Sequence, residues 1–136
     1  MKKIRTTATR TLATIAAAVA TATVLGAGPA HAAVDDGRLF YCVQEVGTSY
    51  YGDVSIPDVM LSYGSTGICV EELQSDLLAV GVVPAADRPG FIDGDFGPKT
   101  RTAVMEFQRR ANVAGGADGI VGPHTWYRLL NAAYFE

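Results

Sequence analysis

One eight-residue phrase occurs twice in this chain, and it constrains the fold more than any other feature of the sequence. The copies are Asp93-Gly94-Asp95-Phe96-Gly97-Pro98-Lys99-Thr100 and Asp118-Gly119-Ile120-Val121-Gly122-Pro123-His124-Thr125, which share five identical residues and begin 25 positions apart. Asp-Gly is a turn signal, and proline at the first position of a helix has its φ preset and wastes no backbone donor. Each copy therefore predicts a loop that opens a helix, and the pair predicts a duplicated structural unit.

The first 32 residues have the layout of a secretory signal peptide. A basic head of four Lys and Arg residues precedes an alanine-rich apolar run over residues 12–25, and Pro29-Ala30-His31-Ala32 supplies a small-x-small cleavage site. The alternative is a membrane anchor, but threonines interrupt the run, which falls short of the roughly 20 residues needed to span a bilayer. We therefore predict a signal peptide over 1–32, cleavage after Ala32, and a secreted, extracellular or cell-wall-associated protein with no membrane partner after cleavage.

Cleavage at this position leaves an acidic chain of 104 residues. Four of the 11 Lys and Arg residues lie before residue 33, whereas all 14 Asp and Glu residues follow it, so residues 33–136 carry a formal charge of −7. A negative chain repels phosphate backbones and anionic membrane surfaces. A chain of this length builds one domain with one modest core. We expect a monomer with no nucleic-acid partner.

The two cysteines, Cys42 and Cys69, both follow the predicted signal peptide. An even number of cysteines in an oxidising compartment favours a disulfide over free thiols. The rival interpretation is a metal ligand or a catalytic thiol, but His124 is the only histidine after residue 32, so both lack partners. We predict a Cys42–Cys69 disulfide, no metal and no cofactor.

Three stretches after Gly64 have helical spacing of apolar residues. They cover residues 65–80, 98–112 and 123–133, and the third carries Trp126, Leu129, Leu130 and Ala133 on one stripe. Such short helices are marginal in water alone, so each must bury its stripe against the other two. We predict an all-α fold, a compact three-helix bundle over residues 64–133 with Trp126 at its centre.

The segment over 33–63 has a different character, because it is rich in turn and β-forming residues. Residues 38–46 are the best strand candidate. Tyr50-Tyr51-Gly52-Asp53 fits either a turn or an exposed aromatic patch for carbohydrate, although tyrosines of an irregular arm more often pack against the domain that follows. We expect an irregular or short-strand arm that is tethered by the disulfide.

The motifs after Gly64 resemble a known family in their order and spacing. They are Gly64-Ser65-x-Gly67-x-x-Val70-x-x-Leu73-Gln74, then Asp93-Gly94-x-Phe96-Gly97-x-x-Thr100-x-x-Ala103-Val104-x-x-Phe107-Gln108, then Asp118-Gly119-Ile120-Val121-Gly122-Pro123-x-Thr125-Trp126. They look like the peptidoglycan-binding domain of the type 1 family, over residues 64–130. The resemblance implies a three-helix bundle that targets cell-wall amidases, peptidases or lytic enzymes to their substrate, and it implies no catalysis by itself.

This chain departs from the family pattern in two respects. Such domains normally accompany a catalytic domain, and the remaining 30 or so residues after residue 32 are too few to build one. A long insertion, Val82 to Phe91, contains Pro84 and Pro89 and separates the first helix from the first repeated loop. We expect an ordered, irregular connection that reshapes the edge of a groove.

Most motif residues carry structural expectations. Asp93 and Asp118 are expected to accept hydrogen bonds from backbone donors of their own loops, and Gln74 and Gln108 are expected either to bridge loop backbone or to touch a ligand. The hydroxyl groups of Thr100 and Thr125 are expected to interact with the first turns of the helices that they open. The residues with an expected structural role are Gly94, Phe96, Gly97, Phe107, Gln108, Gly119, Gly122 and Trp126.

Catalysis is a poor interpretation of the same residues. Asp93 paired with Asp95 or Asp118 would resemble the carboxylates of a glycosidase, but a small helical bundle offers little room for a cleft over several sugars and for a carboxyl with a raised pKa. His124 has no second imidazole to form a zinc site and stands alone as a general base. We expect no enzymatic activity.

The same loops are better suited to binding a ligand than to catalysis. Loops that open helices present free backbone N–H groups, which suit the carboxylates and amide carbonyls of stem peptides. Arg101 has the donors to grip a carboxylate twice, and Tyr127 offers a flat face for a sugar or peptide. The candidate ligand-binding residues are Asp93, Asp95, Lys99, Arg101, Asp118, His124 and Tyr127.

Two functions of different classes fit these observations. The first is a secreted, non-catalytic module that binds peptidoglycan through the loop side of the bundle. The second is a protein-interaction module, an inhibitor or cofactor of a cell-wall hydrolase, in which the arm from Ala33 to Leu61 and its tyrosines contact the partner.

Overall fold

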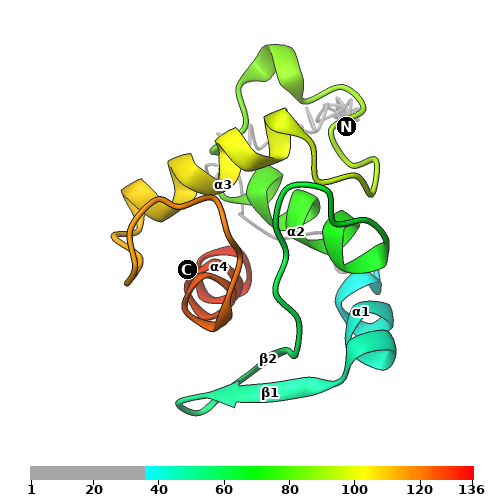
Figure 1. Cartoon of the computed structure of the whole chain (residues 1–136), viewed down its shortest axis with the longest axis vertical. Helices are drawn as coiled ribbons and strands as arrows, with labels where there is room; N and C mark the ends of the chain where they lie inside the picture. The colour runs from blue at the N-terminus through cyan, green and yellow to red at the C-terminus, as the bar shows by residue number, and fades with distance from the viewer. Residues whose placement is uncertain (1–35) are drawn as a thin grey trace, which may run out of the picture.

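A computed structural model describes residues 36–136 as a helical domain with one short two-stranded sheet (Figure 1). In chain order its elements are α1 (Arg38–Val46), β1 (Thr48–Tyr51), β2 (Val54–Pro57), α2 (Ile68–Ala79), the 3-10 helix η1 (Ala85–Asp87), α3 (Pro98–Arg110) and α4 (Pro123–Tyr134). The predicted signal peptide over 1–32 and the first residues of the arm lie outside the described residues. Within residues 36–136, no helix has the length and apolar content needed to cross a membrane.

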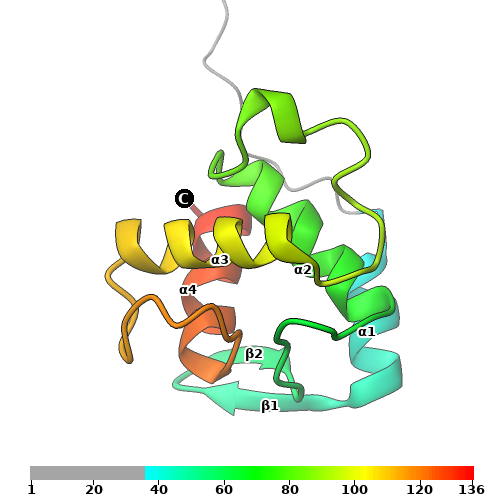
Figure 2. The ribbon, with the colours of Figure 1, turned by 45° about the horizontal axis from the view of Figure 1, so that its top comes forward.

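Helix α2 is the element on which the other helices pack. It contacts α1, α3 and α4, and eight of its 12 residues are buried. Val70, Leu73 and Leu77 are fully buried, as their spacing predicted. Figure 2 shows α3 lying across α2, so the stripe of α2 is covered from more than one side.

Trp126 lies in the core that these helices enclose. Its side chain is fully buried, and its Nε1 donates a hydrogen bond to Val59 O at 3.0 Å. Phe96 from the first repeated loop and Phe107 from α3 are buried in the same cluster. Trp126 therefore joins α4 to the segment that links the hairpin to α2.

The prediction of a strand over residues 38–46 is wrong, because this segment is helix α1. Leu39, Cys42, Val43 and Val46 are its buried and half-buried apolar residues, and they recur at i, i+3, i+4 and i+7. The β-forming side chains suggested a strand, but their spacing places them on one helix face, and packing against α2 overrides intrinsic propensity. A disulfide between Cys42 and Cys69 joins α1 to the first turn of α2, as the cysteine count predicted.

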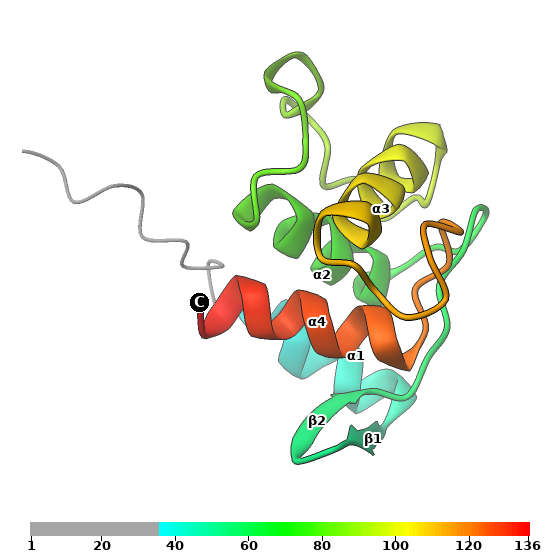
Figure 3. The ribbon, with the colours of Figure 1, turned by 90° about the vertical axis from the view of Figure 1, so that its left-hand side faces the viewer.

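The predicted turn around Gly52-Asp53 is the tip of a β-hairpin. Strands β1 and β2 are antiparallel, with Thr48 opposite Pro57 and Tyr51 opposite Val54. Gly52 has φ 65, which the tight turn requires and which glycine adopts without steric cost. The hairpin contacts α4, and Figure 3 shows the hairpin and α1 on the side of α4 opposite to α3.

The segment over 58–67 runs past both repeated loops and hydrogen-bonds to each. Leu61 exchanges two backbone hydrogen bonds with Val121 of the second loop, at 3.0 and 2.8 Å. Gly67 N donates to Gly94 O, and Phe96 N donates to Ser65 O, both at 2.9 Å. The two loops are therefore fixed to one strap of backbone.

Replacing Trp126 with alanine should lower the free energy of unfolding by about 3–5 kcal/mol, the range for removing a buried aromatic ring. The variant also leaves Val59 O without its indole donor. Urea denaturation followed by circular dichroism measures the change. Phe135→Ala is the control, since that side chain is 77% exposed, and its curve should stay within about 0.5 kcal/mol of wild type. A Trp126→Ala curve that overlaps wild type would contradict the core position.

The double variant Cys42→Ala/Cys69→Ala should lose roughly 3–4 kcal/mol of stability, because the bridge closes a loop with a sequence separation of 27 residues in the unfolded chain. Mass spectrometry of the secreted protein should show a chain that begins at Ala33 and takes up alkylating reagent at two thiols only after reduction. Alkylation without reduction would contradict the bridge, and a retained leader would contradict the cleavage site.

Candidate functional site

The first repeated loop is built around the buried side chain of Gln74 in α2. Its Nε2 donates to Asp93 Oδ1 at 2.8 Å, to Asp95 O at 3.0 Å and to Thr100 Oγ1 at 3.0 Å. Its Oε1 accepts hydrogen bonds from the backbone N–H groups of Asp93 and Gly94 at 2.9 and 3.0 Å. One glutamine therefore satisfies polar groups on both sides of the loop that opens α3.

The second repeated loop has the same arrangement around Gln108 in α3. Its Nε2 donates to Asp118 Oδ1 at 3.0 Å, to Ile120 O at 2.8 Å and to Thr125 Oγ1 at 3.1 Å. Its Oε1 accepts from Gly119 N at 2.9 Å. Gln74 and Gln108 thus bridge loop backbone, which is one of the two roles expected from the sequence.

The aspartates that begin the loops form local turns. Asp93 Oδ1 accepts from Asp95 N at 2.9 Å, and Asp118 Oδ1 accepts from Ile120 N at 2.8 Å. The hydrogen bond from Gln74, followed by that from the backbone N–H of Asp95, lowers the pKa of Asp93 below its ordinary value. Asp93 is therefore held as a carboxylate at the mouth of a surface hollow.

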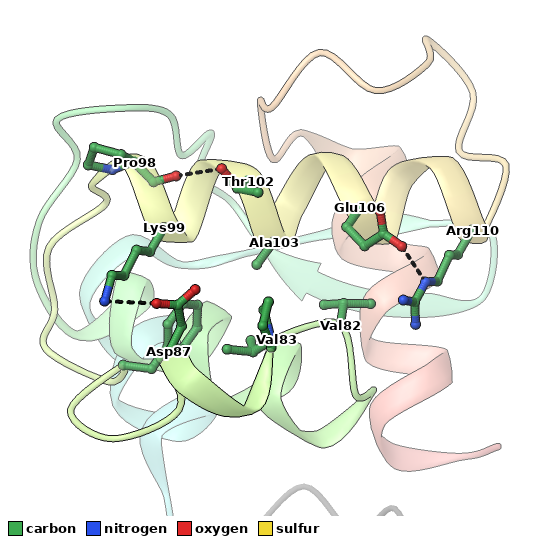
Figure 4. A pocket seen from close by; sticks show the side chains of 11 residues that line it. Val82, Val83, Asp87, Pro98, Lys99, Thr102, Ala103, Glu106 and Arg110 are labelled. Atoms are coloured by element: carbon green, nitrogen blue, oxygen red, sulfur yellow. Dashed lines mark hydrogen bonds and ion pairs between the residues drawn. The ribbon is translucent and has the colours of Figure 1, made fainter.

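A groove lies between the insertion over 82–91 and α3, and we call it the α3 groove (Figure 4). Its volume is about 440 Å³. Val82, Val83 and Phe91 from the insertion and Ala103 from α3 are buried and supply an apolar floor. The expectation that the insertion shapes the edge of a groove agrees with this arrangement.

Two ion pairs line the α3 groove. Lys99 Nζ lies 2.9 Å from Asp87 Oδ1, and Arg110 Nε lies 2.6 Å from Glu106 Oε1. The Lys99 and Arg110 side chains are 66% and 58% exposed. Exposed pairs of this kind are worth about 0–1 kcal/mol, so a ligand can replace either partner at little cost. The groove can therefore accept both carboxylates and amines.

A second hollow of about 400 Å³ adjoins the α3 groove at the start of α3. The two share Asp87 and Lys99, and the second is also lined by Asp93 and Asp95 from the first repeated loop. Three of the seven candidate ligand-binding residues therefore come together here: Asp93, Asp95 and Lys99.

The other four candidates lie elsewhere. Arg101 passes over the backbone of Gly119 in the second loop, where a Cβ added to Gly119 would lie 3.0 Å from Arg101 Cγ. Asp118 belongs to that same loop. His124 and Tyr127 line a separate hollow beside β1, which also contains Tyr51. The seven residues thus divide among three places on the surface.

Sequence reasoning missed three residues that shape these places, and it named Tyr51 only as part of a turn or of an aromatic patch in the arm. Asp87, Glu106 and Arg110 form the charged edges of the α3 groove, and Tyr51 from the hairpin lies against His124 and Tyr127. The spacing of Glu106 and Arg110 at i and i+4 was the available signal for one ion pair. The signal for Tyr51 was the double tyrosine before Gly52. No three His, Cys, Asp or Glu side chains of the described part of the chain gather as a metal site.

Comparison with known proteins identifies the family of this domain. Residues 66–129 match the family described as "Putative peptidoglycan binding domain". The chain is also 38% identical over 120 residues to an uncharacterized protein in the bpoA1 3′ region of Kitasatospora aureofaciens, and this covers 83% of the chain and 87% of that protein. The chain belongs to the peptidoglycan-binding domain family.

Two further relatives show how such a domain is used in longer proteins. A zinc D-Ala-D-Ala carboxypeptidase of Streptomyces albus G is 37% identical over 100 residues, which are 74% of this chain but 32% of the carboxypeptidase. The crystal structure of the SleB N-terminal domain superposes with a TM-score of 0.50 at 29% identity, and covers 57% of this chain and 97% of that domain. Both the sequence and the fold therefore place residues 66–129 in a family of binding domains, some members of which are parts of enzymes.

Replacing Gln74 with alanine should raise the pKa of Asp93 toward its ordinary value, because the largest cause of its lowering is the hydrogen bond from Gln74. The Asp93 contribution to folding is present at neutral pH and is lost as the pH falls through the lowered folded-state pKa; the variant should move this loss to higher pH. Carbon-detected NMR titration of the Asp93 carboxyl measures it. Gln44→Ala, at an exposed position of α1, is the control. An unchanged Asp93 titration would contradict the assignment.

Proposed function

We propose that the chain is secreted, that its mature form begins at Ala33, and that residues 64–133 are a non-catalytic module that binds peptidoglycan. The observation that best supports this proposal is the α3 groove, which has an apolar floor and two exchangeable ion pairs and lies in a domain of this family. Residues 33–63 then serve as an arm that the Cys42–Cys69 disulfide tethers to the module.

Stem peptides are the part of peptidoglycan that the α3 groove suits. They carry free carboxylates and amino groups on a backbone with small apolar side chains, as the D-Ala-D-Ala named for the Streptomyces albus G relative illustrates. Lys99 and Arg110 supply cations for the carboxylates, and Asp87 and Glu106 supply anions for an amine. Val83 and Phe91 supply apolar contact for a methyl group. The proposed ligand therefore uses both chemical characters of the groove.

The charges of the described residues support binding without catalysis. A general acid or base must reach the substrate with a pKa suited to proton transfer. Burial, and then the charge of Glu72, raises the pKa of Asp76 well above its ordinary value, but Asp76 has no exposed surface. The carboxylates at the α3 groove are paired with cations. We therefore propose that the purified chain releases no sugar or amine from the wall.

The double variant Lys99→Ala/Arg110→Ala should weaken retention on purified, protein-free peptidoglycan by roughly 1.5–3 kcal/mol for each charge-assisted hydrogen bond that it removes. Added salt should weaken wild-type retention as well, since exposed charges are screened over about 10 Å at 0.1 M. Sedimentation with the insoluble wall measures both. Arg38→Ala is the control, because Arg38 is a cation of α1 that does not line the groove and pairs with Asp36 and Glu71, which do not line it either.

The same assay tests the rival cation and the absence of catalysis. If Arg101→Ala abolishes retention and the groove variant retains full binding, the ligand lies at the second loop rather than in the α3 groove. If wild type fails to sediment with the wall, the binding function is wrong. If the purified chain releases soluble sugar or amine, and this release persists after contaminating hydrolases have been removed, the non-catalytic assignment is wrong.

A second function is favoured by α1. Phe40 and Tyr41 are 59% and 60% exposed, and the centroids of their rings lie 5.5 Å apart in an edge-to-face arrangement. An exposed aromatic pair on a disulfide-fixed helix suits a protein partner, and a cell-wall hydrolase is the partner class that this family context favours. Retention on the wall that depends on an added hydrolase, and that Phe40→Ala abolishes, would establish this function in place of direct wall binding.

A further inference from the structure

The hollow beside β1, separate from the α3 groove and from the hollow at the start of α3, lies where the hairpin meets the start of α4. We call it the hairpin hollow; its volume is about 280 Å³, and Tyr51, Asn112, His124, Tyr127 and Arg128 line it. This volume lies just below the range of about 300–1,000 Å³ that is typical of pockets for drug-sized ligands. The hollow therefore suits a group the size of one sugar ring rather than a peptide.

Three aromatic rings form one wall of the hairpin hollow. The centroid of the Tyr51 ring lies 4.7 Å from that of His124 and 5.1 Å from that of Tyr127. Tyr51 Oη and His124 Nδ1 share a hydrogen bond of 2.7 Å, which fixes the orientation of the imidazole. His124 forms no Nε2 hydrogen bond within residues 36–136. The wall thus combines aromatic faces with the polar edge of an exposed imidazole.

Two planar polar side chains complete the lining. Arg128 Nη2 donates to Ala111 O at 2.8 Å, which holds the guanidinium at the end of α3. Asn112 is a non-glycine residue at φ 48, and its exposed side chain is part of the same lining. No carboxylate of the described residues lines this hollow, in contrast to the α3 groove. Arginine and asparagine offer several donors in fixed planar geometry.

These features define a ligand chemistry. The apolar C–H face of a pyranose ring packs on aromatic rings, which supply large, rigid contact area with a polar edge. Its hydroxyl and acetamido groups need planar donors and acceptors in the same small space, and His124, Asn112 and Arg128 provide them. The absence of a lining carboxylate among the described residues disfavours amines. With Arg128 as its cation, held by Ala111 O, the lining suits a sugar ring whose hydroxyl and acetamido groups accept hydrogen bonds.

We propose that the hairpin hollow is a second binding site, for a sugar ring of the glycan strand, built jointly by the arm and the family domain. Tyr51 precedes the residues 66–129 that match the family, whereas His124, Tyr127 and Arg128 lie within them. The identity of the sugar as part of peptidoglycan rests on the proposed function. The arm thus adds a glycan contact to a domain whose α3 groove holds the stem peptide.

The test uses the mature, disulfide-bonded chain and an N-acetylglucosamine tetramer that carries no peptide. NMR titration should shift the imidazole resonances of His124 and the backbone resonances of Tyr127, and added salt should leave the affinity unchanged because the probe is neutral. Tyr127→Ala should weaken binding at least about tenfold, which corresponds to 1.4 kcal/mol. Arg128→Ala and Tyr51→Phe, which keep the three rings in place, should weaken it by a smaller factor.

Tyr50→Ala is the matched control, since Tyr50 is the neighbour of Tyr51 in β1, is 76% exposed and does not line the hollow. Its affinity for the tetramer should equal that of wild type. A wild-type chain that binds whole wall but shows no shift at His124 with the tetramer overturns the glycan site and leaves the proposed function intact. A chain that binds the tetramer at His124 but not whole wall supports the site and overturns the proposed function. Tetramer binding that Arg128→Ala and Tyr51→Phe both leave unchanged also overturns the site.

Discussion

The structure depends on two buried glutamines, Gln74 and Gln108, more than on any single apolar contact. Each makes hydrogen bonds to backbone and side-chain groups of the loop that opens the next helix. A loop carries polar backbone groups that cannot be buried without partners, and an unmade hydrogen bond costs about 1–3 kcal/mol. By satisfying those groups, the glutamines let Phe96 and Val121 enter the core from the loops. The core and the surface loops are therefore set by the same two side chains.

This dependence explains which parts of the fold could be predicted from the sequence. The repeated phrase determines local geometry, and Pro98 and Pro123 are indeed the first residues of α3 and α4. Helix α1 could not be assigned in the same way, because Leu39, Cys42 and Val46 have helical spacing while the intervening side chains favour strands. Its state is decided by packing on α2 and by the bridge to Cys69, which are long-range contacts that propensity does not contain.

The candidate site was predictable only in part for a related reason. Lys99 could be found because it lies inside a repeated phrase, whereas Asp87 comes from an insertion without a repeat, and Glu106 and Arg110 lie two turns and more along α3. The α3 groove exists only because the chain returns after α2 and lays Val83 against α3. Such a return is a property of the tertiary fold. Lys99, at the start of α3, could therefore be predicted from the sequence, whereas Asp87, Glu106 and Arg110, which the fold brings to the edges of the groove, could not.

The α3 groove and the hairpin hollow differ in charge because they are made by different parts of the chain. The α3 groove ends at Arg110, and the hairpin hollow begins at the next residue, Ala111. On the first side the insertion contributes Asp87, so that cations and anions both line the α3 groove. Salt therefore weakens the attraction between these charges and a charged ligand. On the second side the hairpin contributes Tyr51, and the lining is mostly aromatic, with the cation Arg128 and no carboxylate of the described residues. Under the proposed function, a glycan strand that carries stem peptides would place a peptide in the α3 groove and a sugar ring in the hairpin hollow, so the arm would belong to the recognition surface through Tyr51.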